Sequence, residues 1–121
     1  MKNLKMNEDT YILRRKVMGV IYQAKTFTEL PRINVRITEN DTESGKVLGR
    51  GRVGGAVVIF IPLRAFNLSE NDFKYVVYHE IIHTAFNKGH SKAGLMRPVI
   101  ETGLSSEEVD NLFKCEVNRN I

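Results

Sequence analysis

Cysteine is almost missing from this sequence, and long apolar runs are missing altogether. Cys115 is the one cysteine among 121 residues, which excludes a disulfide within the chain and a cysteine-based zinc site. A single cysteine also fits a reducing compartment. No segment offers the run of about 20 apolar residues that a membrane-spanning helix needs. Charges at Arg14, Arg15 and Lys16 interrupt the stretch that a signal peptide would require, so we expect a cytoplasmic protein.

Basic runs interleaved with aromatic residues are missing as well. The net charge is +4 and the isoelectric point is about 9.3, but the lysines and arginines are scattered along the chain. This balance permits nucleic-acid binding without requiring it, and a solvated basic surface is the simpler explanation. Repeats and low-complexity segments are absent too. We treat residues 1–121 as a single domain, long enough to bury one core.

Apolar residues recur at helical spacing in three segments and at strand spacing in others, which predicts an α+β fold with a small twisted mixed sheet. In chain order the sequence predicts a helix within 7–25, a half-buried strand over 33–38, a glycine-broken edge strand over 46–53, a strand buried on both faces over 56–61, a helix over about 70–86 and a last helix over about 105–117.

The helix over 70–86 is apolar on most sides, so it should lie in the core. Ser69 is a good N-cap, and Asp72 stands three residues on as in a short capping box. Asn87 or Gly89 can end the helix in a left-handed conformation. Ser105 or Ser106 should cap the last helix.

All three histidines of the chain, His79, His83 and His90, fall within one short window. His79 and His83 stand four residues apart, so on a helix their imidazoles share a face and can reach one metal ion. Glu80 lies on the neighbouring face, where it can take a proton from a water molecule without being a ligand. A lone buried histidine is more often hydrogen-bonded than metal-bound, but the complete His-Glu-x-x-His pattern favours a metal site.

Catalytic zinc usually has three protein ligands and one open position. His90 directly follows Gly89, a residue at which the chain can turn back towards the metal, and it is our expected third ligand. A carboxylate of the last helix, from Glu107 or Glu108, is the alternative. The sequence thus predicts one Zn²⁺ ion per chain.

The segment HEIIHTAFNKGHSKAGLMRP resembles the zinc-binding segment and Met-turn of the metzincin metallopeptidases, above all their matrixin-like branch. The likeness extends over about half of the chain, from Val47 to Phe113, and implies a minimal zincin-like domain. It also implies that Met96 forms an apolar floor under the metal. In this chain six residues separate His83 from His90, where the family has five.

The same resemblance implies an extended peptide substrate paired with the edge strand and a pocket wall just after the Met-turn. The substrate-binding residues would be Leu48, Gly49, Arg50, Pro98, Val99 and Ile100. The chain is also similar to Spartan/SprT-like proteases, which place a short sheet before the histidine helix. Larger members of that group add a cysteine zinc ribbon, which one cysteine cannot build.

We therefore predict a zinc metalloendopeptidase that acts on peptides or proteins, with Glu80 as general base. Two alternatives stay open: a SprT-like protease acting on DNA-bound proteins, and a non-catalytic zinc-stabilised module that binds protein or nucleic acid. The basic residues for nucleic-acid docking would be Arg50, Arg52, Lys88 and Lys92. No membrane partner is expected, and the pattern leaves the oligomeric state open.

Overall fold

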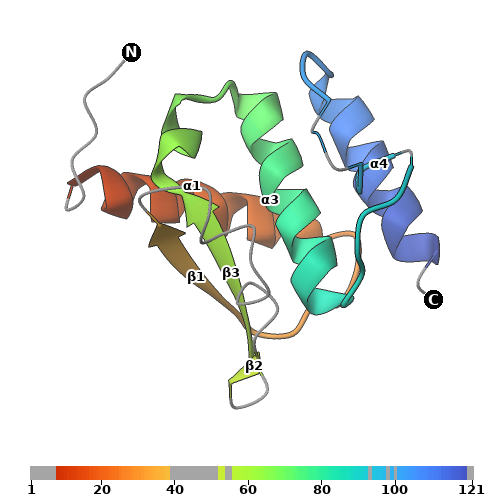
Figure 1. Ribbon diagram of the computed structural model, residues 1–121, viewed down its shortest axis with the longest axis horizontal. Helices are drawn as coiled ribbons and strands as arrows, with labels where there is room; N and C mark the ends of the chain where they lie inside the picture. The colour runs from red at the N-terminus through yellow and green to blue at the C-terminus, as the bar shows by residue number, and fades with distance from the viewer. Residues whose placement is uncertain are drawn as a thin grey trace.

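A computed structural model of the chain describes residues 8–38, 52–53, 56–92, 94–97, 99 and 101–119. Within them the chain folds as an α+β structure, as the sequence predicts (Figure 1). The elements in chain order are α1 (Glu8–Lys25), β1 (Ile33–Thr38), β2 (Arg52–Val53), β3 (Ala56–Pro62), the short 3-10 helix η2 (Leu63–Asn67), α3 (Glu70–Ala85) and α4 (Ser106–Arg119).

The sheet is mixed and has the strand order β1-β3-β2. β1 runs parallel to β3, with Ile33 opposite Val57, and β2 runs antiparallel to β3. The prediction that β3 is buried on both faces is wrong in part. Val57 and its same-face neighbours are fully buried, but Phe60 is only half-buried, because the described elements cover one face of the strand more completely than the other.

Helix α1 presents one apolar face to the core. Leu13, Val17, Ile21 and Ala24 follow each other at steps of three or four residues, and all are buried. This spacing places them on one side of the helix, so the segment is amphipathic in the way its sequence predicts.

Helix α3 lies between β3 and α4 (Figure 1). The hydroxyl oxygen of Ser69 accepts a hydrogen bond from the backbone N–H of Asp72 at 3.3 Å, so the expected N-cap is confirmed. The helix ends at Ala85, and Asn87 takes the left-handed conformation with φ 52°. Of the two residues expected to end the helix, it is therefore Asn87 that adopts the positive φ.

Helix α4 covers the side of α3 that faces away from the sheet. The ring of Phe113 stacks on Tyr78 at 4.3 Å between centroids, and the Tyr78 hydroxyl donates to Asp110 at 2.8 Å. Burial and this hydrogen bond raise the pKa of the Tyr78 hydroxyl far above its usual value. With α4 in place, α3 is buried on most sides. No helix among the described residues is long and apolar enough to cross a membrane.

Candidate metal centre

Helix α3 brings the imidazoles of His79 and His83 together, as their spacing of four residues predicts. Their Nε2 atoms are 3.0 Å apart, and their rings meet edge to face at 4.6 Å between centroids. Ligands of a tetrahedral zinc ion with bonds of about 2.0–2.1 Å stand about 3.3 Å apart. The two nitrogen atoms thus have nearly the separation that one metal ion requires.

Backbone carbonyl groups fix the tautomer of both rings. The Nδ1 atom of His79 is 2.8 Å from the carbonyl oxygen of Leu95, and that of His83 is 2.7 Å from the carbonyl oxygen of Lys88. A carbonyl oxygen can only accept a hydrogen bond, so each Nδ1 atom carries the proton. In the neutral rings each Nε2 atom then carries a lone pair, and a cation bound by both atoms would relieve the repulsion between the two lone pairs.

The third histidine comes from the loop after α3. The ring centroid of His90 lies 5.2 Å from that of His79 and 4.7 Å from that of His83. One ligand atom from each of the three side chains lies within 4.8 Å of the other two. Across the described ranges this is the group of His, Cys, Asp or Glu side chains that could hold a metal ion. The three histidines predicted as ligands therefore lie together in a group that could hold a metal ion.

Burial differs across the three histidines. His79 is buried, His83 is half-buried and His90 is exposed. Burial lowers the pKa of the His79 imidazole, because desolvation disfavours its charged form. A neutral imidazole is the form that binds metal, so the environment of His79 favours the ligand state. The exposed side of the group, at His90, faces solvent.

The loop that returns towards α3 is closed by its own backbone. The N–H of Ser91 donates to the carbonyl oxygen of Met96 at 2.8 Å, and Leu95 and Met96 are both fully buried. The loop thus carries the Leu95 carbonyl on a segment anchored in the core. Met96 is part of the buried core, and its role as an apolar floor under a metal ion stays a prediction.

Glu80 follows His79 directly on α3 and is half-buried. Successive residues of an α-helix are turned by about 100°, so the side chain of Glu80 projects beside the line of the two histidines. Its backbone carbonyl accepts from the Thr84 hydroxyl at 2.9 Å. Helix geometry therefore places Glu80 on the face next to that of the two histidines, and Glu80 does not belong to the histidine group that could hold a metal ion.

The carboxylates considered as alternative ligands do not join the histidines. Glu107 and Glu108 are both exposed near the start of α4. Glu108 instead forms a capping box with Ser105, since its carboxylate accepts from the Ser105 N–H and its own N–H donates to the Ser105 hydroxyl, both at 3.1 Å. Ser105 is thus the N-cap of α4.

Most of the predicted substrate-binding residues lie outside the described part of the chain. These are Leu48, Gly49, Arg50, Pro98 and Ile100. Val99 is described, and its side chain is 74% exposed, so a bound molecule could reach it.

Glu116 and Tyr75 are neighbours of the site that sequence reasoning missed. Glu116 is 1% exposed and Tyr75 is fully buried, with its hydroxyl donating to the carbonyl oxygen of Gly94 at 3.2 Å. A signal for Glu116 does exist. It follows Val109 and Phe113 at steps of four and three residues, so it occupies an apolar position of α4 and should face the core.

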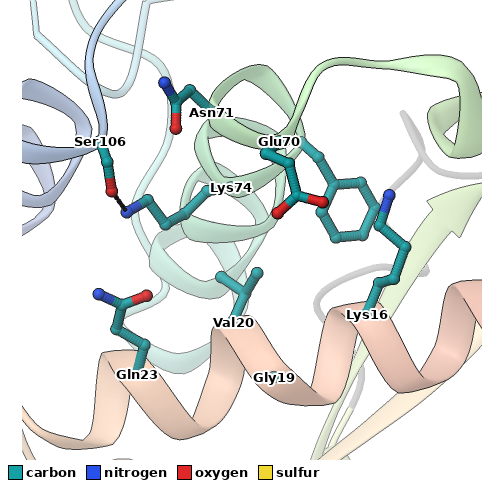
Figure 2. A pocket seen from close by; sticks show the side chains of 9 residues that line it. Lys16, Gly19, Val20, Gln23, Glu70, Asn71, Lys74 and Ser106 are labelled. Carbon is teal, nitrogen blue, oxygen red and sulfur yellow. Dashed lines mark hydrogen bonds between the residues drawn. The ribbon is translucent and has the colours of Figure 1, made fainter.

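Two hollows on the described surface lie away from the histidines. One, of about 290 Å³, is formed where α1, α3 and α4 meet (Figure 2). Its Lys74 ammonium group donates to the Ser106 hydroxyl and pairs with Asp110 at 2.9 Å, so its charge is already neutralised. A second hollow, of about 320 Å³, is lined by Thr26 and Phe27, which follow α1, and by residues of α4. Neither contains residues of the metal centre.

Compared with protein-family models, curated proteins and solved structures, the chain has no match.

We expect the purified protein to bind about one divalent metal ion per chain, because one ligand atom from each of three histidines lies within 4.8 Å of the other two. His79→Ala and His83→Ala should each abolish stoichiometric binding, since each removes one of the two nitrogen atoms that face each other. Elemental analysis after metal loading and gel filtration measures this directly.

Glu107→Ala and His90→Ala form the matched pair for the third ligand. Loss of the loop imidazole should weaken metal binding strongly, whereas loss of an exposed carboxylate should leave it unchanged. Stronger weakening by Glu107→Ala, or full metal content in His79→Ala, would show that the ligand set is different.

Proposed function

We propose that this protein is a zinc-dependent endopeptidase that hydrolyses peptide bonds in peptide or protein substrates. One observation carries the proposal: three imidazoles converge at the end of a buried helix on which a glutamate directly follows the first of them. The resemblance of the segment 79–98 to metzincin metallopeptidases supports the same reaction.

The donor set favours zinc. Imidazole nitrogen is a ligand that zinc accepts readily, and three such donors leave one of the four usual positions open for water or substrate. A structural zinc site would normally close this position with a further cysteine or histidine. The chain has no further histidine, and Cys115 lies exposed on α4. Zinc bound here would acidify a water molecule and polarise the scissile carbonyl group.

Glu80 would act as general base. Its carboxylate would take a proton from the attacking water and pass it to the nitrogen of the leaving amine, so that the carboxylate is regenerated. Its place beside His79 on a rigid, buried helix would hold it in one position through both transfers. Leu95 and Lys88 would contribute through their carbonyl groups, which keep His79 and His83 in the metal-binding tautomer.

The sheet offers an edge for the substrate. β2 is the outer strand of the order β1-β3-β2 in the described residues, and an extended peptide can add to such an edge by backbone hydrogen bonds. The proposed substrate-binding residues Leu48, Gly49 and Arg50 come shortly before β2 in the chain. The exposed Val99 would contact the substrate on the far side of the scissile bond.

Glu80→Gln tests the proposed catalysis. The amide keeps the size of the side chain but cannot take a proton, so cleavage of an unfolded-protein or peptide-library substrate should fall at least about a hundredfold. Metal content and helix content should stay at the wild-type level. Glu107→Gln, which changes an exposed glutamate, is the matched control and should cleave normally. Equal cleavage by wild type and Glu80→Gln would refute the role of Glu80.

Nucleic-acid binding is a second candidate function, and one observation on α1 favours it. Tyr11 and Tyr22 are 63% and 60% exposed. The Arg15 guanidinium carbon lies 5.9 Å from the Tyr11 ring centroid, and the Lys25 ammonium nitrogen lies 5.6 Å from that of Tyr22. Aromatic rings beside cations can stack on bases and attract phosphates. Of the basic residues first considered, Lys88 is engaged by Glu116 at 2.7 Å.

For this second function we expect a fluorescent single-stranded DNA to bind in a salt-dependent way. The double variant Tyr11→Ala/Tyr22→Ala should weaken binding at least about tenfold, because stacking contributes about 1–3 kcal/mol per base. Tyr11→Phe/Tyr22→Phe keeps both rings and should bind as the wild type does. Unchanged affinity in the alanine variant would exclude α1 as the binding surface.

A further inference from the structure

Glu116 of α4 is a buried carboxylate that the proposed catalysis does not use. It is 1% exposed, and it pairs with the ammonium group of Lys88 at 2.7 Å and with the guanidinium group of Arg119 at 3.2 Å. Burying a carboxylate costs free energy. Even when the carboxylate is paired, an apolar residue of similar volume often gives a fold that is as stable or more stable. The presence of a charge here calls for a reason beyond packing.

We propose that Glu116 is a positioning residue of the metal centre, which holds in place both backbone carbonyl groups that orient the helical histidines. The inference rests on the proposed metal site. One side chain on α4 contacts two separate loop segments. Each segment supplies the carbonyl oxygen that accepts a hydrogen bond from a different histidine.

The first segment is the turn after α3. The side chain of Lys88 reaches the Oε2 atom of Glu116, while the backbone carbonyl of the same residue accepts from the Nδ1 atom of His83 at 2.7 Å. Lys88 directly follows Asn87, whose left-handed backbone turns the chain away from the helix. The ion pair therefore anchors the residue whose carbonyl fixes the His83 ring.

The second segment is the tight turn that carries Leu95. Gly94 has a φ of +78°, and a Cβ atom added to it would lie 3.3 Å from the Oε1 atom of Glu116. The backbone of Gly94 is thus packed against the carboxylate from one side, and the Tyr75 hydroxyl binds its carbonyl oxygen at 3.2 Å. The next carbonyl along the chain, that of Leu95, accepts from His79.

The two oxygens of Glu116 therefore face the two segments: Oε2 binds the Lys88 side chain, and Oε1, which also accepts from Arg119, lies against Gly94. A neutral or shorter side chain would release Lys88 and leave the Gly94 turn less supported. Both carbonyl groups would then move relative to α3, and both imidazoles would lose a fixed orientation. Changes to such outer partners typically weaken metal binding about 10- to 100-fold.

The test compares Glu116→Gln with Asp110→Asn. Asp110 is a carboxylate on the same helix that also pairs with a lysine, Lys74 of α3, at 2.9 Å. Its described partners lie on α1 and α3 and not on either loop segment. Both variants exchange a carboxylate for its amide, and both should lower thermal stability. Only Glu116→Gln should weaken zinc affinity about 10- to 100-fold in a chelator competition.

A second readout needs no metal. In the metal-free protein, Glu116→Gln should speed hydrogen exchange of the Ser91 amide, which bonds the Met96 carbonyl at 2.8 Å and closes the loop. Asp110→Asn should leave this exchange rate unchanged. Lys88→Met removes the charged partner of Glu116. The Lys88 side chain is 26% exposed, so this change disturbs the core less, and it should reproduce both effects if Glu116→Gln does not fold.

The outcomes separate the positioning role from the metal site itself. Wild-type zinc affinity in Glu116→Gln and Lys88→Met would overturn the positioning role and leave the metal site standing. Equal weakening by Asp110→Asn would also overturn it, because general destabilisation would then explain the loss. If the wild-type protein binds no zinc, the proposed function fails, and an unchanged Ser91 exchange rate in Glu116→Gln would then overturn the positioning role as well.

Discussion

Two hydrogen bonds from histidine Nδ1 atoms to backbone carbonyl groups are the interactions on which the site depends. They join His79 to Leu95 and His83 to Lys88, at 2.8 and 2.7 Å. Both acceptors lie on the chain that follows α3. Lys88 stands in the turn at the end of the helix, and the loop that carries Leu95 must fold back onto the helix for the bond to His79 to form. A carbonyl oxygen only accepts, so the bonds assign a proton to each Nδ1 atom, and the two Nε2 atoms lie 3.0 Å apart. A helix alone would bring the rings near each other but would not orient them.

The surrounding fold supplies the support for this loop. β3 covers one side of α3, and α4 covers another through the stacked pair of Phe113 and Tyr78. α3 is thereby buried over most of its surface, and Leu95 and Met96 extend the same core under the loop. Burial in turn lowers the pKa of the His79 imidazole, because desolvation disfavours the charged form. The packing that buries α3 thus also sets the environment of the candidate site.

Features set by local sequence could be predicted, and those set by contacts between distant residues could not. The cap at Ser69, the strand over 33–38 and the grouping of His79 with His83 follow from spacing and side-chain chemistry within one element. Long-range partners do not. Lys88 and Glu116 are 28 residues apart, and nothing in either segment specifies the other.

The same limit explains one prediction that is wrong in part and one alternative that the structure does not support. β3 is uniformly apolar in sequence, so its less covered face could not be recognised without knowing what packs there. Glu107 and Glu108 matched a ligand position only by their order in the chain, and capping chemistry at Ser105 accounts for Glu108 instead. His90 was identified correctly as a member of the group because the turn after α3 is itself a local feature.

The central claim is that His79, His83 and His90 hold one metal ion and leave one position open. X-ray absorption at the zinc edge of the reconstituted protein tests it most directly. The account predicts three imidazole nitrogen atoms and one further oxygen or nitrogen atom, all at about 2.0–2.1 Å. A sulfur atom in the ligand shell, or a shell of oxygen atoms with fewer than three imidazoles, would contradict it.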